Sequence, residues 1–176
     1  MGEKMLTKID LCSMALLKLG ENPIQSLSDE TAPAKLARTL IDFVIDTLLA
    51  MHPWRFACHE YTIVRDENGN LNIPSDVLRI IKTNARLSEN KIMSDADSVK
   101  IVAIRRVAPD SFPSYFASLV STKLAVEFCI PLTSDQSIFR TLVALYETEL
   151  QTAKFIDSTT SINPAIENFS LLDSRF

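Results

Sequence analysis

Glycine and histidine are both scarce in this 176-residue chain, and each scarcity excludes a class of site. With three glycines, the sequence holds neither a Gly-x-Gly-x-x-Gly fingerprint nor a P-loop, so no phosphate-binding loop of these kinds is expected. Neither of the two histidines lies in a plausible catalytic triad. We therefore expect a protein that is not an enzyme, with no catalytic residue and no cofactor.

Cysteines and long uncharged apolar runs are also few. Cys12, Cys58 and Cys129 are widely spaced within apolar segments, which indicates reduced core cysteines of a cytosolic product. The N-terminus lacks the apolar run of a signal peptide, and no uncharged apolar segment is long enough to span a bilayer. A membrane partner is therefore not expected. The net charge of -4 argues against a broad basic surface for nucleic acid.

Two segments match part of a metal-binding pattern but lack the remaining ligands or turn residues. His52, Cys58 and His59 are close in sequence, but zinc needs three or four converging ligands, usually as paired spacings on two elements. The loop at residues 66–70 starts like a calcium loop, but Leu71 stands where the glycine of the sharp turn belongs. No metal site is predicted.

The most informative stretch is a predicted helix over residues 32–51, because its apolar side chains spread over about half of the circumference. A surface helix needs a narrower stripe. One side of this helix can be covered by the chain's own core, and the other side by a neighbouring subunit. A central core helix in a monomer remains the alternative. Pro53 ends the helix, because the residue before proline is pushed out of the α region.

The periodicities in the rest of the chain predict a fold class that is α+β and mainly α. We predict a four-helix bundle with a small antiparallel β-rich insert between helices 2 and 3, and an extended C-terminal tail. One domain spans residues 1–156 and the tail spans residues 157–176. The predicted helices and the insert are residues 7–19, 32–51, 111–130 and 134–155, and residues 60–107.

Local signals support these boundaries. Thr7 can cap the first helix, which Gly20 ends, and Ser134 can cap the fourth. Within the insert, residues 61–65 and 71–73 are expected to pair as a hairpin across an Asn-Gly turn, with later strands at residues 77–83 and 99–107. The third helix has almost no polar face apart from a Lys–Glu pair, so it should be surrounded by other elements.

Large apolar residues outside the helix patterns are candidate anchors or interface residues. Trp54 and Phe56 follow the long helix directly. The tail carries four more, and a purely solvated spacer would rarely contain them. The tail can fold onto a partner or pack back on its own bundle, and the pattern does not decide between the two. The four are Phe169, Leu171, Leu172 and Phe176.

Positive charge gathers on the β-rich insert at Arg79, Lys82, Arg105 and Arg106. Lysine and arginine commonly protect strand edges, and we favour that explanation. The alternative is contact with nucleic acid, but no aromatic stacking residues are interleaved with these charges.

Several segments resemble the tail tubular protein A group of phage head-to-tail adaptors. The most specific is the turn His52-Pro53-Trp54-Arg55-Phe56-Ala57 after a helix. The similarity spans most of the chain up to about Phe155. Its other segments are residues 15–24, 26–30, 49–51, 73–80, 104–107, 112–116 and 125–133.

This resemblance implies a subunit of a ring, expected to be dodecameric, beneath the portal protein of a DNA-filled capsid. Such a ring extends the DNA channel, lets genomic DNA pass without sequence-specific binding, and offers a platform to the next tail component. The protein would be made in the bacterial cytoplasm and end at the head–tail junction of the virion. Two alternatives stay open: a small helical module that holds nucleic acid with the basic insert, and, much weaker, a metal-dependent enzyme centred on His52, Cys58 and His59.

Overall fold

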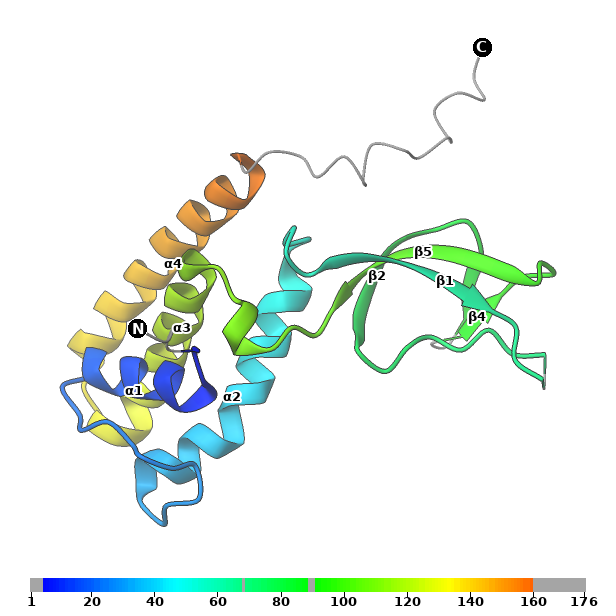
Figure 1. The fold of residues 1–176 in the computed structure, drawn as a ribbon. Helices are drawn as coiled ribbons and strands as arrows, with labels where there is room; N and C mark the ends of the chain where they lie inside the picture. The colour runs from blue at the N-terminus through cyan, green and yellow to red at the C-terminus, as the bar shows by residue number, and fades with distance from the viewer. Residues whose placement is uncertain (1–4, 68, 89–90, 160–176) are drawn as a thin grey trace.

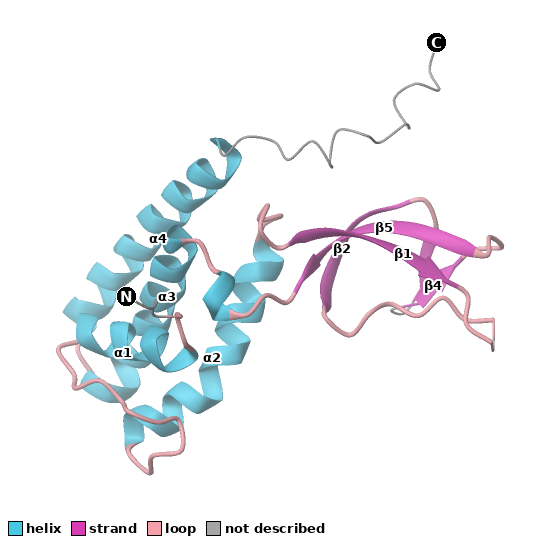
Figure 2. Cartoon of the chain, in the orientation of Figure 1, coloured by secondary structure: helices cyan, strands magenta, loops and turns pink. Residues whose placement is uncertain are grey.

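The structure, a computed structural model, describes residues 5–67, 69–88 and 91–159. A helical bundle occupies one side of the molecule and a twisted antiparallel sheet projects from the end of α2 (Figures 1 and 2). The predicted fold class is confirmed, including the insertion of the strands between the second and third long helices. The elements are α1 (Lys8–Lys18), α2 (Ala32–Met51), β1 (Cys58–Val64), β2 (Val77–Thr83), β3 (Arg86–Ser88), β4 (Lys91–Met93), β5 (Ser98–Arg105), the 3₁₀ turn η1 (Pro109–Ser111), α3 (Ser114–Thr133) and α4 (Gln136–Thr159).

The ends of α1 and α2 follow from their capping residues. The Thr7 side chain accepts a hydrogen bond from the Asp10 backbone N–H, and Asp10 bonds back to the Thr7 N–H, which completes a capping box. Gly20 follows the end of α1 with a φ of 78°, a conformation in which a Cβ would be strained. At the start of α2 the Thr31 side chain accepts a hydrogen bond from the Ala34 N–H, so both predicted starts are confirmed.

The third helix, α3, is the centre of the bundle. It packs against α1, α2 and α4, as its nearly unbroken apolar sequence predicts. By length and composition it is apolar enough to cross a membrane, but most of its candidate span is buried inside the bundle, as in the core helix of a soluble protein. The predicted pair between Lys123 and Glu127 forms on its partly exposed side, with 2.6 Å between Nζ and Oε1.

The junction between α3 and α4 differs from the prediction. The sequence predicts that α3 ends near Pro131, but the helix continues to Thr133, because a proline in the last turn removes only one intrahelical hydrogen bond. Ser134 then adopts the left-handed conformation with a φ of 54° and cannot cap α4. Asp135 does so instead, since its Oδ1 accepts hydrogen bonds from the backbone N–H groups of Ser137 and Ile138.

The fourth helix, α4, is also longer than predicted. We expected it to end at residue 155 and an extended tail to begin at residue 157, but α4 continues to Thr159. The reason is that Asp157 extends the buried stripe of the helix, four residues beyond buried Ala153. Because Asp157 is polar, apolar periodicity alone does not predict that α4 continues past residue 155.

The sheet has the order β1-β5-β2, with β5 in the centre and both neighbours antiparallel to it. The predicted hairpin between residues 61–65 and 71–73 is wrong: β1 pairs with β5, and residues 71–73 form no strand. Strand β5 is eight residues long and pairs with all of β1, so it offers β1 a longer partner than three residues before Pro74. The short strands β3 and β4 form a separate hairpin.

Two apolar cores result, one in the bundle and one in the sheet. Ile104 belongs to the bundle core, whereas Val99, Ile101 and Ala103 belong to the sheet core, so β5 contributes to both. A bidentate pair between Arg106 and Asp46 of α2 joins the base of the sheet to the bundle, with distances of 2.8 and 2.6 Å.

Candidate interaction sites

The turn after α2 is an aromatic cluster that belongs to the subunit's own core. Trp54 is fully buried, and its indole Nε1–H donates to the Leu48 carbonyl at 2.7 Å. The ring centroid of Trp54 lies 5.1 Å from that of Phe116 in an edge-on arrangement. The ring centroid of Phe56 lies 4.9 Å from that of Phe116. Trp54 is therefore an anchor of the fold, and its side chain is not available to a neighbour in this conformation.

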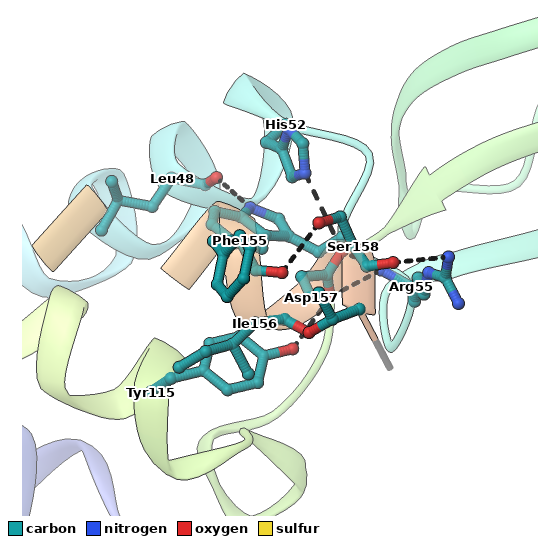
Figure 3. Close-up of polar contacts among 10 residues, drawn as sticks. Leu48, His52, Arg55, Tyr115, Phe155, Ile156, Asp157 and Ser158 are labelled. Carbon is teal, nitrogen blue, oxygen red and sulfur yellow. Dashed lines mark hydrogen bonds and ion pairs between the residues drawn. The ribbon is translucent and has the colours of Figure 1, made fainter. Parts of the chain in front are cut away.

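The same turn is joined to the last turn of α4 by Asp157, a residue that is 3 % exposed (Figure 3). Both carboxylate oxygens lie 3.2 Å from the backbone N of Arg55, which donates to them. The Tyr115 hydroxyl of α3 donates to Oδ1 at 2.8 Å. We name these residues, with His52, the Asp157 cluster; it ties α4 to α3 and to the turn after α2.

Two pKa shifts report the environment of the Asp157 cluster. Burial, the hydrogen bond to Asp157 and its negative charge together raise the pKa of Tyr115 above its usual value of 10. His52 Nε2 lies 3.8 Å from Asp157 Oδ2. Burial lowers the pKa of His52 below 6.5, and the opposing attraction of Asp157 is the smaller effect.

The opposing effects at His52 give a testable result. Replacing Asp157 by asparagine removes the negative charge that favours the imidazolium, so the pKa of His52 should fall further below 6.5. NMR titration of the imidazole resonances measures this shift, and His59, which lies on the sheet, serves as the internal control. An unchanged or raised pKa of His52 would show that Asp157 does not act on it.

The basic residues of the insert do not form one patch. On the sheet, Arg79 is opposite Ile104 and Lys82 is opposite Val102, whereas Arg105 is opposite Val77. Because successive residues of a strand point to opposite faces, Arg105 lies on the other face from Arg79 and Lys82. Arg106 lies beyond the strand and is paired with Asp46.

The histidines and the half-buried cysteine near the turn also lie apart. His59 and Cys58 are consecutive on β1, so they point to opposite faces of the sheet. The ring of His59 packs edge-on against Tyr61, and that of His52 against Trp54. In the part of the chain that the structure describes, no group of three or more His, Cys, Asp or Glu side chains could hold a metal ion.

The four apolar anchors predicted in the tail, Phe169, Leu171, Leu172 and Phe176, lie outside the described residues. The sequence reasoning missed the Asp157 cluster, although one signal was present. Tyr146, Leu150, Ala153 and Asp157 follow one another at helical spacing, so Asp157 falls on the inner face of α4.

Comparison with known proteins identifies a family for this chain. No curated protein matches the chain. The family described as "Tube: Tail tubular protein" matches residues 9–155, which include all four helices apart from the first residue of α1 and the last turn of α4. Because this match covers most of the chain, the chain belongs to the tail tubular protein family and is a structural component of a phage tail.

Proposed function

We propose that this protein is the head-to-tail adaptor subunit of its phage. Copies of the chain form a ring beneath the portal protein, extend the DNA channel and give the next tail component a platform. The protein has no enzymatic role, and it reaches the head–tail junction of the virion after synthesis in the bacterial cytoplasm. The family membership supports an assembly of several subunits in the tail.

The observation that carries the proposal is the uncovered apolar face of α2. Phe43, in the middle of α2, is 69 % exposed although the helix packs on α3 by its other side. A soluble monomer rarely leaves so large an apolar side chain in a row with others, and such rows mark sites of association.

The arrangement of charge supports a channel more than a nucleic-acid-binding module. The protein carries a net charge of -4, and affinity for DNA comes mainly from releasing counterions to lysine and arginine. Arg106 is neutralised by Asp46, and Arg105 and Arg79 lie on different faces of the sheet. DNA can therefore pass such a subunit without being held by it.

Removing residues 160–176 should separate folding from assembly. We expect the shortened protein to remain soluble and helical, because α4 ends at Thr159 and every residue of the Asp157 cluster is retained. It should assemble poorly onto portal rings, because the deletion removes the four apolar anchors Phe169, Leu171, Leu172 and Phe176. Electron microscopy of portal rings mixed with full-length or shortened protein measures assembly, and circular dichroism measures folding.

A matched control keeps the length and changes only polar residues of the segment, Glu167 and Asn168 to alanine. This variant should assemble as the full-length protein does. The role of the segment would be wrong if the shortened protein completed virions normally. The ring itself would be wrong if the full-length protein added no density below the portal.

A further inference from the structure

The uncovered face of α2 carries an apolar stripe in which Thr47 is a polar member, and the charges beside the stripe are already paired. Leu36, Leu40, Phe43 and Met51 recur at spacings that place them on one side of the helix. Phe43 and Met51 are exposed, and the two leucines are half-buried at the margin of the core.

A partner that covers this stripe would not leave the charged residues beside it without an ion-pair partner. Lys35 is paired with Glu30 at 2.8 Å. Asp42 is paired with Lys8 at 2.5 Å, and Asp46 is paired with Arg106. A surface can be covered at low cost when no isolated charge must be buried with it. The stripe is therefore suited to a partner that is itself uncharged along its length.

The outer face of α4 is such a surface. Leu145, Phe155 and Ile156 are exposed on it, and Phe155 is 68 % exposed. Most of the other residues of this face are small or carry hydroxyls, and three of these hydroxyls donate to backbone carbonyls of their own helix, at 3.0 or 3.1 Å. These are the hydroxyls of Thr141, Thr148 and Thr152.

No charged residue lies on this outer face, because Arg140, Glu147 and Lys154 project from one flank and Glu149 from the other. Glu149 is engaged with Thr122 of α3 at 2.5 Å. Within the described chain, the outer face of α4 is thus a helix face without charged residues, as a partner for the stripe of α2 requires.

One subunit cannot use its own α4 to cover its own α2. Both helices pack on α3, and they lie on opposite sides of it (Figure 1). The matching surface must therefore come from a second copy of the chain.

We infer that the α2 stripe of one subunit packs against the outer face of α4 of the next. The inference rests on the proposed function and adds to it the two surfaces in contact. Because the two surfaces differ, each copy can bind one neighbour on either side, and this head-to-tail arrangement closes into a ring when the rotation allows it. The apolar stripes form the centre of the contact and the flanking charges form its rim.

Site-directed crosslinking tests the pairing of these faces. Phe43→Cys and Phe155→Cys proteins, each also carrying Cys58→Ser, are mixed at high concentration with a flexible bismaleimide. Cys12 and Cys129 are buried, and burial raises the pKa of Cys12 to about 12, so the background reaction should be slow. Both replaced phenylalanines are mostly exposed, so both variants should fold.

The expected result is a mixed 43–155 dimer at several times the yield of either 43–43 or 155–155. Leu17→Cys is the matched control, because Leu17 is an exposed apolar residue of α1 on the wall of a groove between α1 and α3. Equal yields for all pairs would overturn the pairing. A dominant 43–43 product would show that α2 meets α2, and a dominant 43–17 product that α2 enters the groove; either result overturns the inference.

A second readout uses charge instead of thiols. Phe43→Glu and Phe155→Glu should each prevent growth beyond the subunit, and their equimolar mixture should sediment as a dimer held by its one intact contact. Dimers of Phe155→Glu alone would contradict a head-to-tail contact. Failure of the proposed function appears separately, as the absence of added density on portal rings.

Discussion

Replacing Trp54 by alanine is expected to lower the free energy of unfolding by about 3–5 kcal/mol, the usual cost of removing a buried aromatic side chain. Trp54 is fully buried where the turn after α2 meets α3. The substitution also leaves the Leu48 carbonyl without its indole donor. Urea denaturation followed by circular dichroism measures the change.

The control is Phe155→Ala, which removes another aromatic side chain from a surface position. Phe155 is mostly exposed on α4, so its loss should change stability by less than about 0.5 kcal/mol. If Trp54→Ala destabilised the protein as little as Phe155→Ala, Trp54 would not be an anchor of the fold.

Replacing Asp157 by alanine should cost about 2–3 kcal/mol, because buried donors to a charged acceptor lose their partner. The affected donors are the Tyr115 hydroxyl and the Arg55 backbone N–H, one from α3 and one from the turn after α2. We expect the last turn of α4 to open before the rest of the bundle, and hydrogen exchange of the amides in residues 153–159 detects this.

A double-mutant cycle distinguishes the cluster from a general loss of packing. Tyr115→Phe removes only the hydroxyl donor, so Tyr115→Phe and Asp157→Ala together should cost less than the sum of the two single changes. Additive effects would contradict a direct interaction. Asp157→Asn keeps an acceptor at the same position and should cost less than the alanine variant.

The sequence is sufficient for the helices that carry their own start and stop signals. Thr31 and Pro53 bracket α2 closely enough for its predicted limits to coincide with the observed ones. The width of its apolar sector also indicates a helix with more apolar surface than the bundle covers, and Phe43 is left in solvent. Whether a neighbouring subunit covers that surface stays a prediction.

Tertiary contacts decide the features that the sequence does not reveal. The segment at residues 71–73 has the local signals of a strand, but β5 supplies β1 with a longer partner from forty residues farther along the chain. Similarly, Ser134 has good capping propensity, but it adopts the left-handed conformation, and Asp135 caps α4 instead. Propensity alone cannot weigh such competition.

The Asp157 cluster was missed for a related reason, because a buried carboxylate breaks an apolar pattern unless its donors are known. One of its donors is a backbone N–H, which every residue except proline has and which no side-chain motif identifies. The exposed stripe of α4 was missed because its alanines and threonines have neither strong charge nor strong hydropathy.

The position of the Asp157 cluster has a mechanical consequence. A pull on the chain beyond Thr159 reaches α4 at its C-terminal end, where an ordinary helix frays first. Here the terminal turn is tied to α3 and to the turn after α2, so these two elements share the load with α4. Tension between a virion and whatever grips this end of the chain would thus be borne by the entire bundle.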